Sequence, residues 1–190
     1  MSTIPPSSSH ADPTSDAGTD WLAAPLAHLV QFIVHDYHVP LRTNLPYLLA
    51  NAEGIDPAEW PDVIGTVREC LGALAREVPP HLDYEEQQLF PAIEALARGD
   101  RAPFQRELSS LPDVEQQHGQ FGARLRELAR VTTWFTPPAG VGPAVAELCA
   151  DLSSLMEATY VHVHLERNVL LPRATQLCDA LAARLPAEPP

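Results

Sequence analysis

Two stretches of the sequence, 81 residues apart, carry the same residue types at the same spacing. "HLDYEEQQLFPAI" begins at position 81 and "HVHLERNVLLPRA" begins at position 162. Each has a histidine, a glutamate four positions later, a leucine after four more and a proline two positions beyond that leucine. A further histidine precedes each stretch, His38 by 43 positions and His118 by 44. The pattern predicts two equivalent halves, each with one early histidine and one HxxxE pair.

Apolar residues recur with the period of a helix through most of the chain, whereas strand-like alternation is scarce. Four such segments cover roughly residues 20–54, 57–99, 103–134 and 143–184. Short connections between long helices favour antiparallel neighbours. We therefore predict an all-α fold, an up-down-up-down four-helix bundle with an approximate internal two-fold repeat.

The chain ends differ from its middle in composition. Residues 1–20 are rich in Ser, Thr, Pro and Asp and offer little to bury, so we expect a disordered tail. Residues 186–190 are expected to form a flexible tail for the same reason. The remaining 21–185 are expected to be one domain, since 45% of this 190-residue chain is hydrophobic and can close a sizeable core.

Prolines interrupt the predicted helices. They stand at positions 40, 46, 79, 80, 91 and 172. Each removes a backbone hydrogen bond and crowds the preceding turn, so we expect kinks or breaks there. Three of them, Pro40, Pro79 and Pro80, stand beside histidines. They either shape a site or mark loops, and the sequence leaves that open.

The formal net charge of −13 argues against several classes of partner. Nucleic acids and anionic membrane surfaces require a basic footprint, so neither is an expected partner. No apolar run reaches the roughly 18 residues that span a bilayer, and the N-terminus lacks a secretory signal pattern. The three widely spaced cysteines suit buried, reduced thiols. We therefore expect a cytoplasmic protein.

The spacing within HxxxE has a chemical use. Residues four apart on a helix differ by about 40° in direction, so their side chains can converge on one point. The two pairs and the two early histidines form one candidate set of metal ligands: His38, His81, Glu85, His118, His162 and Glu166. Imidazole with carboxylate suits iron, and paired carboxylates in a bundle core can bridge two ions. A structural zinc needs only four ligands, usually with thiolates, and fits this set poorly.

Other histidines near these positions are expected to play lesser parts. His164 is turned about 200° from His162 on a helix, so the two cannot serve one site. His35 lies one helical turn before His38 and is a candidate for contacts around the ligands.

Two other glutamates near the HxxxE pair at 81–85 are also considered. Glu77, one turn before His81, is a candidate for contacts around the ligands and for proton relay. Glu86 is turned about 100° from Glu85, so we expect it to face solvent.

With these residues, the sequence resembles the hemerythrin-like (HHE cation-binding) domain, and within it the iron-sulfur cluster repair di-iron proteins. The resemblance rests on "WLAAPLAHLVQFIVHDYHVPLRTNLPYLL", "VEQQHGQFGARLREL" and the two repeated HxxxE stretches. It implies a four-helix bundle with a non-haem di-iron centre. Each iron would be bound by two histidines, with both glutamates bridging the ions, often with an oxo bridge.

Two departures place the sequence within that family. Oxygen-carrying hemerythrins have a fifth histidine four positions after the third-helix histidine, where this chain has Gly122, and an aspartate where it has Arg167. The ligand set therefore resembles the repair type. Full-length repair proteins also carry an N-terminal domain with adjacent cysteines. Residues 1–20 contain no cysteine, so we expect this chain to lack that domain.

The resemblance implies a non-haem di-iron protein of the nitrosative and oxidative stress response. Such a centre would bind or reduce NO or O2 species and support iron-sulfur cluster repair, with iron-sulfur client proteins as partners. One alternative is reversible O2 binding, storage or sensing without turnover, and another is an iron-storage or interaction module. Whether the protein is an enzyme stays open; if it is, the expected activity is di-iron redox chemistry such as NO reduction.

Overall fold

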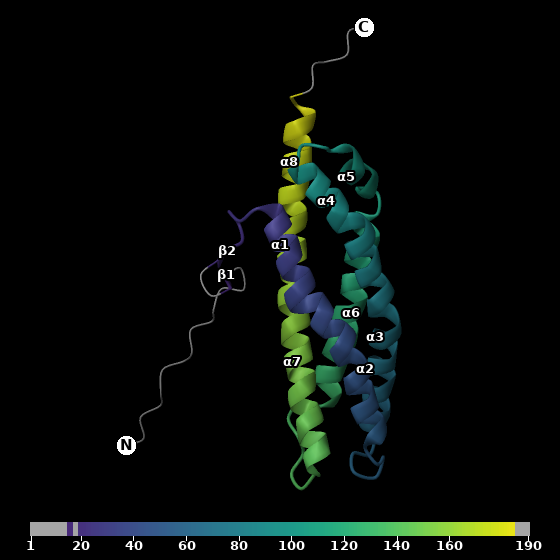
Figure 1. Ribbon diagram of the computed structural model, residues 1–190. Coiled ribbons are helices and arrows are strands. Elements are labelled where there is room, and N and C mark those ends of the chain that lie inside the picture. Colours follow the sequence, from purple (N-terminus) through teal and green to yellow (C-terminus); the bar gives the residue numbers. More distant parts are fainter. Residues whose placement is uncertain (1–14, 17–18, 185–190) are drawn as a thin grey trace, which may run out of the picture.

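Four long helical rods make up most of the computed structural model, which describes residues 15–16 and 19–184 (Figure 1). Three of the rods contain a π-helical segment between two α-helices. In chain order the rods are α1 (Leu26–Ile33), η1 (Val34–His38) and α2 (Val39–Gly54); α3 (Ile64–Tyr84), η2 (Glu85–Leu89) and α4 (Phe90–Ala97); α6 (Leu111–Val131), after the short α5 (Ala102–Glu107); and α7 (Pro143–Leu165), η3 (Glu166–Leu170) and α8 (Leu171–Ala182). The all-α prediction is confirmed.

Successive rods run in opposite directions, and their connections lie at alternating ends of the bundle (Figure 1). Helix α2 packs against α3 and α7, α3 packs against α6, and α6 packs against α7. At the end of the bundle drawn uppermost in Figure 1, α4 contacts both α1 and α8. Each rod thus contacts two neighbours around a central core, which confirms the predicted up-down-up-down bundle.

Short strands precede the bundle. Strands β1 (Ser15–Asp16) and β2 (Thr19–Asp20) form an antiparallel pair within the predicted N-terminal tail. The rest of that tail, residues 1–14 and 17–18, and the predicted C-terminal tail 186–190 lie outside the described residues. Within residues 15–16 and 19–184, none of the helices combines the length and apolar character needed to cross a membrane.

Each π-helical segment ends two residues before a proline: Pro40, Pro91 or Pro172. The residue before each proline donates its N–H to the carbonyl five residues back, as Phe90 does to Glu85. A proline ring crowds the carbonyl four residues before it in an α-helix, and the wider π turn is one way to relieve this. The rods therefore continue past these prolines.

The other three prolines do not end a helix either. Pro46 lies inside α2, and the tandem Pro79-Pro80 lies inside α3. Of the kinks or breaks expected at the six prolines, the breaks are therefore wrong, because the helical rods continue past all of them. Pro40, Pro79 and Pro80 belong to helices and not to loops.

The bundle core consists of two apolar clusters with a polar layer between them. Leu45 and Leu71 belong to the cluster around α2, α3, α6 and α7, whereas Ile33 and Ile93 belong to the cluster around α1, α4 and α8. The cysteines are unpaired and buried in these clusters, as predicted: Cys70, Cys149 and Cys178. The polar layer between the clusters holds the candidate site.

Candidate metal centre

Six polar side chains from all four rods meet in this layer, and the most exposed of them is only 7% exposed. They are the six residues predicted as ligands: His38 of η1, His81 of α3, Glu85 of η2, His118 of α6, His162 of α7 and Glu166 of η3. The structure therefore brings the whole predicted set together in one buried place.

The π segments position three of these side chains. Glu85 and Glu166 are the first residues of η2 and η3, and His38 is the last residue of η1. The N–H of each glutamate still donates to the carbonyl four residues back, that of His81 or His162. Each HxxxE pair therefore keeps its α-helical register, and the chain widens only after the glutamate.

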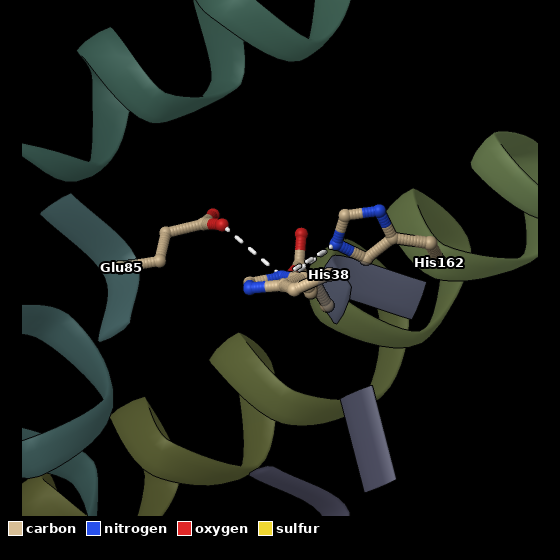
Figure 2. A group of neighbouring side chains, drawn as sticks. His38, Glu85 and His162 are labelled. Carbon is tan, nitrogen blue, oxygen red and sulfur yellow. Dashed lines mark hydrogen bonds and ion pairs between the residues drawn. The ribbon is translucent and has the colours of Figure 1, made fainter. Parts of the chain in front are cut away.

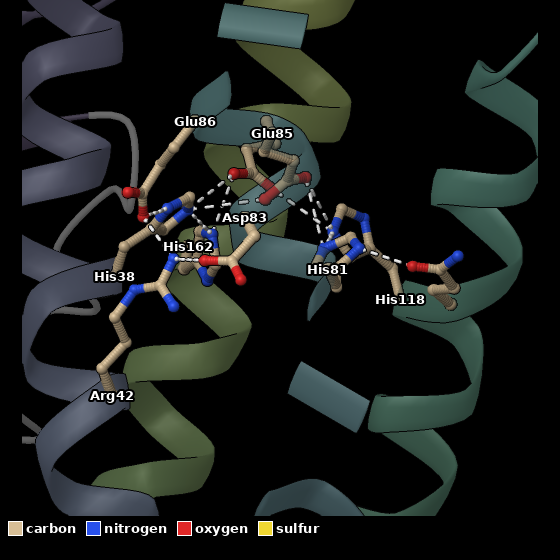
Figure 3. A network of polar contacts seen from close by, with 10 residues as sticks. His38, Arg42, His81, Asp83, Glu85, Glu86, His118 and His162 are labelled. Atoms are coloured by element: carbon tan, nitrogen blue, oxygen red, sulfur yellow. Dashed lines mark hydrogen bonds and ion pairs between the residues drawn. The ribbon is translucent and has the colours of Figure 1, made fainter. Parts of the chain in front are cut away.

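The four histidines form two pairs. The Nε2 atoms of His38 and His162 lie 3.0 Å apart, and those of His81 and His118 lie 2.9 Å apart (Figures 2 and 3). Each pair takes one histidine from each half of the repeat, and exchanging the halves exchanges the pairs. Sequence spacing did not reveal this pairing.

Both carboxylates face both pairs. Glu85 Oε2 lies 3.5 Å from His38 Nε2, and Glu85 Oε1 lies 3.3 Å from His81 Nε2. Glu166 Oε1 lies 2.8 Å from His162 Nε2, and Glu166 Oε2 lies 3.2 Å from His118 Nε2. Each glutamate therefore offers one oxygen to each histidine pair, which is the arrangement of a bridging carboxylate.

The donor set fits two cations. Oε2 of Glu85 and Oε2 of Glu166 are buried and have no hydrogen-bond partner. Donor atoms of both glutamates, His38 and His162 lie within 4.8 Å of one another, and so do those of Glu85, His81 and His118. Burying a carboxylate without an opposite charge beside it costs several kcal/mol. One cation at each histidine pair would supply that charge.

The charges within the layer support each other. Burial lowers the pKa of His118, but the hydrogen bonds and charges of Glu166 and Glu85 outweigh this effect and raise that pKa to about 10. Burial raises the pKa of Glu166, but His162, His118 and His38 outweigh it and hold that pKa well below its usual range. The carboxylates therefore stay anionic, as metal ligands must.

Comparison with known families agrees with this geometry. The family model described as the hemerythrin HHE cation binding domain matches residues 30–174, which contain all six side chains. The chain belongs to the hemerythrin HHE cation-binding domain family.

Several relatives of this HHE chain are named iron-sulfur cluster repair protein YtfE. That of Edwardsiella ictaluri (strain 93-146) is 34% identical over 166 residues, which cover 86% of this chain and 72% of that protein. Those of Yersinia pseudotuberculosis serotype IB (strain PB1/+) and Escherichia coli O1:K1 / APEC are 31% identical over 157 residues, covering 82% of this chain and 68% or 69% of those proteins. The resemblance seen in the sequence is confirmed.

A charged network lies behind His38 in the HHE centre (Figure 3). His38 Nδ1 and Glu86 Oε1 are 3.0 Å apart, so the imidazole N–H can donate to this carboxylate. Arg42 Nη2 lies 3.1 Å from Glu86 Oε1 and 2.7 Å from Asp83 Oδ1. Glu86, expected to face solvent, is 30% exposed and paired. The expectation that Glu86 faces solvent is therefore wrong, because His38 and Arg42 of the neighbouring rod lie on that side.

The other rings of the HHE centre have different surroundings. His81 Nδ1 donates to Gln117 Oε1 at 2.8 Å, while His162 Nδ1 is buried without a partner. Aromatic rings pack against two of the imidazoles. Tyr37 stacks on His162 with the ring centroids 5.7 Å apart, and Phe121 meets His81 edge-on with the centroids 5.1 Å apart. Sequence reasoning missed Gln117, because no spacing rule connects it to His81.

The two residues predicted to lie around the ligands do not contact them. The His35 side chain is 86% exposed and its Nδ1 lies 3.3 Å from Asp36. His35 lies within η1, and each residue of a π turn rotates less about the helix axis than a residue of an α-helix. His35 and His38 therefore point in different directions. Glu77 instead forms a two-bond ion pair with Arg124 of α6, at 2.6 and 3.0 Å. The partners that the structure gives these two side chains are therefore Asp36 and Arg124, not the candidate ligands.

A pocket between α6 and α7 leads towards the HHE centre. Its volume is about 310 Å³, and His118, Gly119, Gly122 and Arg126 line it. A smaller apolar cavity of about 20 Å³ touches His81, His118 and His162 from inside the bundle. His118 belongs to both walls. With no side chain at Gly122, the pocket reaches a candidate ligand.

Proposed function

We propose that this HHE protein is a non-haem di-iron protein of the nitrosative and oxidative stress response. The observation that carries the proposal is that each buried glutamate offers one oxygen to each histidine pair. Two equivalent N/O donor sets sharing two carboxylates suit a pair of irons far better than a single zinc ion.

Each protein residue has a defined part in this proposal. The Nε2 atoms of the four histidines would hold the irons, His38 with His162 and His81 with His118. Glu85 and Glu166 would keep the two ions together as their charge changes. The bound pair would supply one-electron and two-electron redox chemistry towards NO or O2. Two imidazoles and shared carboxylates leave each iron room for a further ligand.

The surroundings suit a small ligand. The pocket beside His118 connects the site to the surface, and the cavity of about 20 Å³ is lined largely by apolar side chains such as Leu74 and Val78. A cavity of this size has room for a molecule about as large as water or a diatomic gas. NO and O2 are therefore the proposed ligands.

The names of the relatives extend the proposal to iron-sulfur cluster repair, with damaged iron-sulfur proteins as clients. Three unpaired cysteines and a net charge of −13 support a cytoplasmic location and argue against nucleic-acid partners. Whether NO is turned over or only bound decides whether the protein is an enzyme.

Metal analysis with an absorption spectrum tests the site. Wild-type protein loaded with iron should contain two irons per chain and show the charge-transfer absorption of a coupled ferric pair. Glu166→Ala should lose both features, because Glu166 contacts both histidine pairs. One metal per chain, zinc alone, or an unchanged variant spectrum would overturn the assignment.

Gas chemistry separates the candidate functions. Consumption of NO with formation of N2O supports the stress-response enzyme, and air-stable reversible oxygenation supports O2 binding, storage or sensing. Inertness towards both gases leaves iron storage or an interaction module. Gly122 in place of a fifth histidine favours the first function over the second, because it leaves the site open beside His118.

A further inference from the structure

The two ends of the metal centre have matching donors but opposite surroundings. The repeat aligns His38 with His118 and the first HxxxE stretch with the second. Each residue of the network behind His38 therefore has an aligned position in the other half of the sequence. The aligned residues are Arg42 with Gly122, Asp83 with His164, and Glu86 with Arg167. A network with two carboxylates is thus matched by residues without any carboxylate.

The His38 end carries a net negative network. Glu86 and Asp83 supply two negative charges and Arg42 supplies one positive charge. The three side chains are linked by contacts of 2.7 and 3.1 Å, and Glu86 alone contacts the imidazole of His38. Because Arg42 holds both carboxylates, Glu86 is kept in position to accept from Nδ1 (Figure 3).

The His118 end has no such network. Arg167 pairs with Glu115 at 3.2 Å near the surface, and His164 is hydrogen-bonded to Asn168. The position aligned with Arg42 is Gly122, which has no side chain and lines the pocket beside His118.

The four outer nitrogens of the imidazoles are therefore unequal. Among the four candidate ligand histidines, which all lie in the described residues, only His38 has a carboxylate as the hydrogen-bond partner of its Nδ1. His81 has the neutral amide of Gln117, and His162 has no partner. A carboxylate behind a ligating imidazole raises the basicity of its other nitrogen and favours the more highly charged metal ion.

We propose that Glu86, held by Arg42 and Asp83, makes the two metal positions unequal. His38 and His162 would hold the iron that stays ferric when a chemical reductant supplies one electron to a diferric centre, and His81 and His118 would hold the iron that takes up this electron. No covalent bond would be made or broken. The ferrous position would then be the one beside the pocket that His118 lines. This inference rests on the proposed di-iron function and makes Glu86 a positioning residue.

Stepwise reduction of the iron-loaded protein with dithionite tests the inference, followed by Mössbauer spectroscopy of the half-reduced sample. In wild type, most of the iron should give the signals of a spin-coupled mixed-valent pair, and little should give those of diferric or diferrous protein. Glu86→Gln retains the shape and an acceptor oxygen but removes the charge. Its mixed-valent population should fall several-fold, because the two reduction potentials move closer together.

A second variant moves the charge to the other end. Gln117→Glu combined with Glu86→Gln places a carboxylate behind His81 in place of His38, and should restore the mixed-valent population. Glu127→Gln, which alters an exposed ion pair with Arg130, is the matched control and should behave as wild type. Glu86→Asp, which retains the charge, should remain close to wild type. If Glu86→Gln does not fold, Glu86→Ala, which also removes the charge, replaces it and should lower the mixed-valent population likewise.

The iron content is measured first and separates the two hypotheses. If wild type does not bind two irons, the proposed function fails. If two irons are present but Glu86→Gln matches wild type and Glu127→Gln in its mixed-valent population and both potentials, the inference about Glu86 is wrong while the di-iron centre stands.

Discussion

The His38 end and the His118 end of the polar layer are alike at their donors and unlike around them. The histidine nitrogens lie 3.0 Å apart in one pair and 2.9 Å apart in the other. Beyond the donors, Arg42 and its two carboxylates stand behind one end, whereas a pocket lined by Gly122 reaches the other. The internal symmetry therefore covers the ligands and the π segments after both glutamates, but it does not extend to the side chains around them. The ligands must satisfy the same chemistry twice, whereas each surrounding rod packs in its own way.

The largest expected effect comes from removing what the two ends share. Glu166→Ala should lose both metals, because its oxygens lie 2.8 and 3.2 Å from histidines of the two pairs. His118→Ala should lose only the metal at its own end, which elemental analysis of the loaded protein would show. If His118→Ala also lost both ions, the two ends would bind metal as one unit.

The next effect is expected at His81. Gln117→Ala removes the acceptor of its Nδ1–H, and loss of such a partner typically lowers metal affinity about 10–100-fold. Competition with a chelator measures the affinity at that end. Gln116→Ala, the exposed neighbour, is the control and should leave the affinity unchanged. Equal affinities of the two variants would show that the amide does not support His81.

A smaller effect is expected on access. Gly122→Leu places a side chain in the pocket beside His118 and should slow the binding of azide to the iron-loaded protein several-fold. Stopped-flow absorption measures the rate. Gly72→Leu, in the interior of α3 and beside Arg76 as Gly122 is beside Arg126, gives a like change in helix propensity away from the pocket. If both variants bound azide at the wild-type rate, ligands would enter by another route.

The smallest effect is expected on stability. Arg42→Ala disrupts ion pairs to Asp83 and Glu86 in which Arg42 is only 31% exposed, and should lower the free energy of unfolding by about 1 kcal/mol. Arg167→Ala breaks a pair in which both partners are more than half exposed and should cost less than about 0.5 kcal/mol. Urea unfolding of the metal-free protein measures both. A larger loss of unfolding free energy for Arg167→Ala than for Arg42→Ala would contradict the contrast between the His38 end, which has the charged network, and the His118 end.

Sequence reasoning predicted most of the fold and the inner set of the site. Helical periodicity located the four rods, and the i, i+4 spacing placed Glu85 and Glu166 beside His81 and His162. These features depend on neighbours within one helix, so the order of residues suffices to predict them. The expected breaks at the prolines were wrong. At Pro40, Pro91 and Pro172 a π turn relieves the crowding, and propensity rules for α-helices do not include that option.

The sequence by itself determined the helical class, the two-fold pattern and the identity of the six buried donors, since all three follow from regular spacing along the chain. Only the tertiary structure decided that His38 pairs with His162, that Glu86 and Gln117 support different rings, and that the site opens at Gly122. Those relations join residues from different rods. They depend on how the rods rotate and pack against one another, which side-chain packing across the core settles.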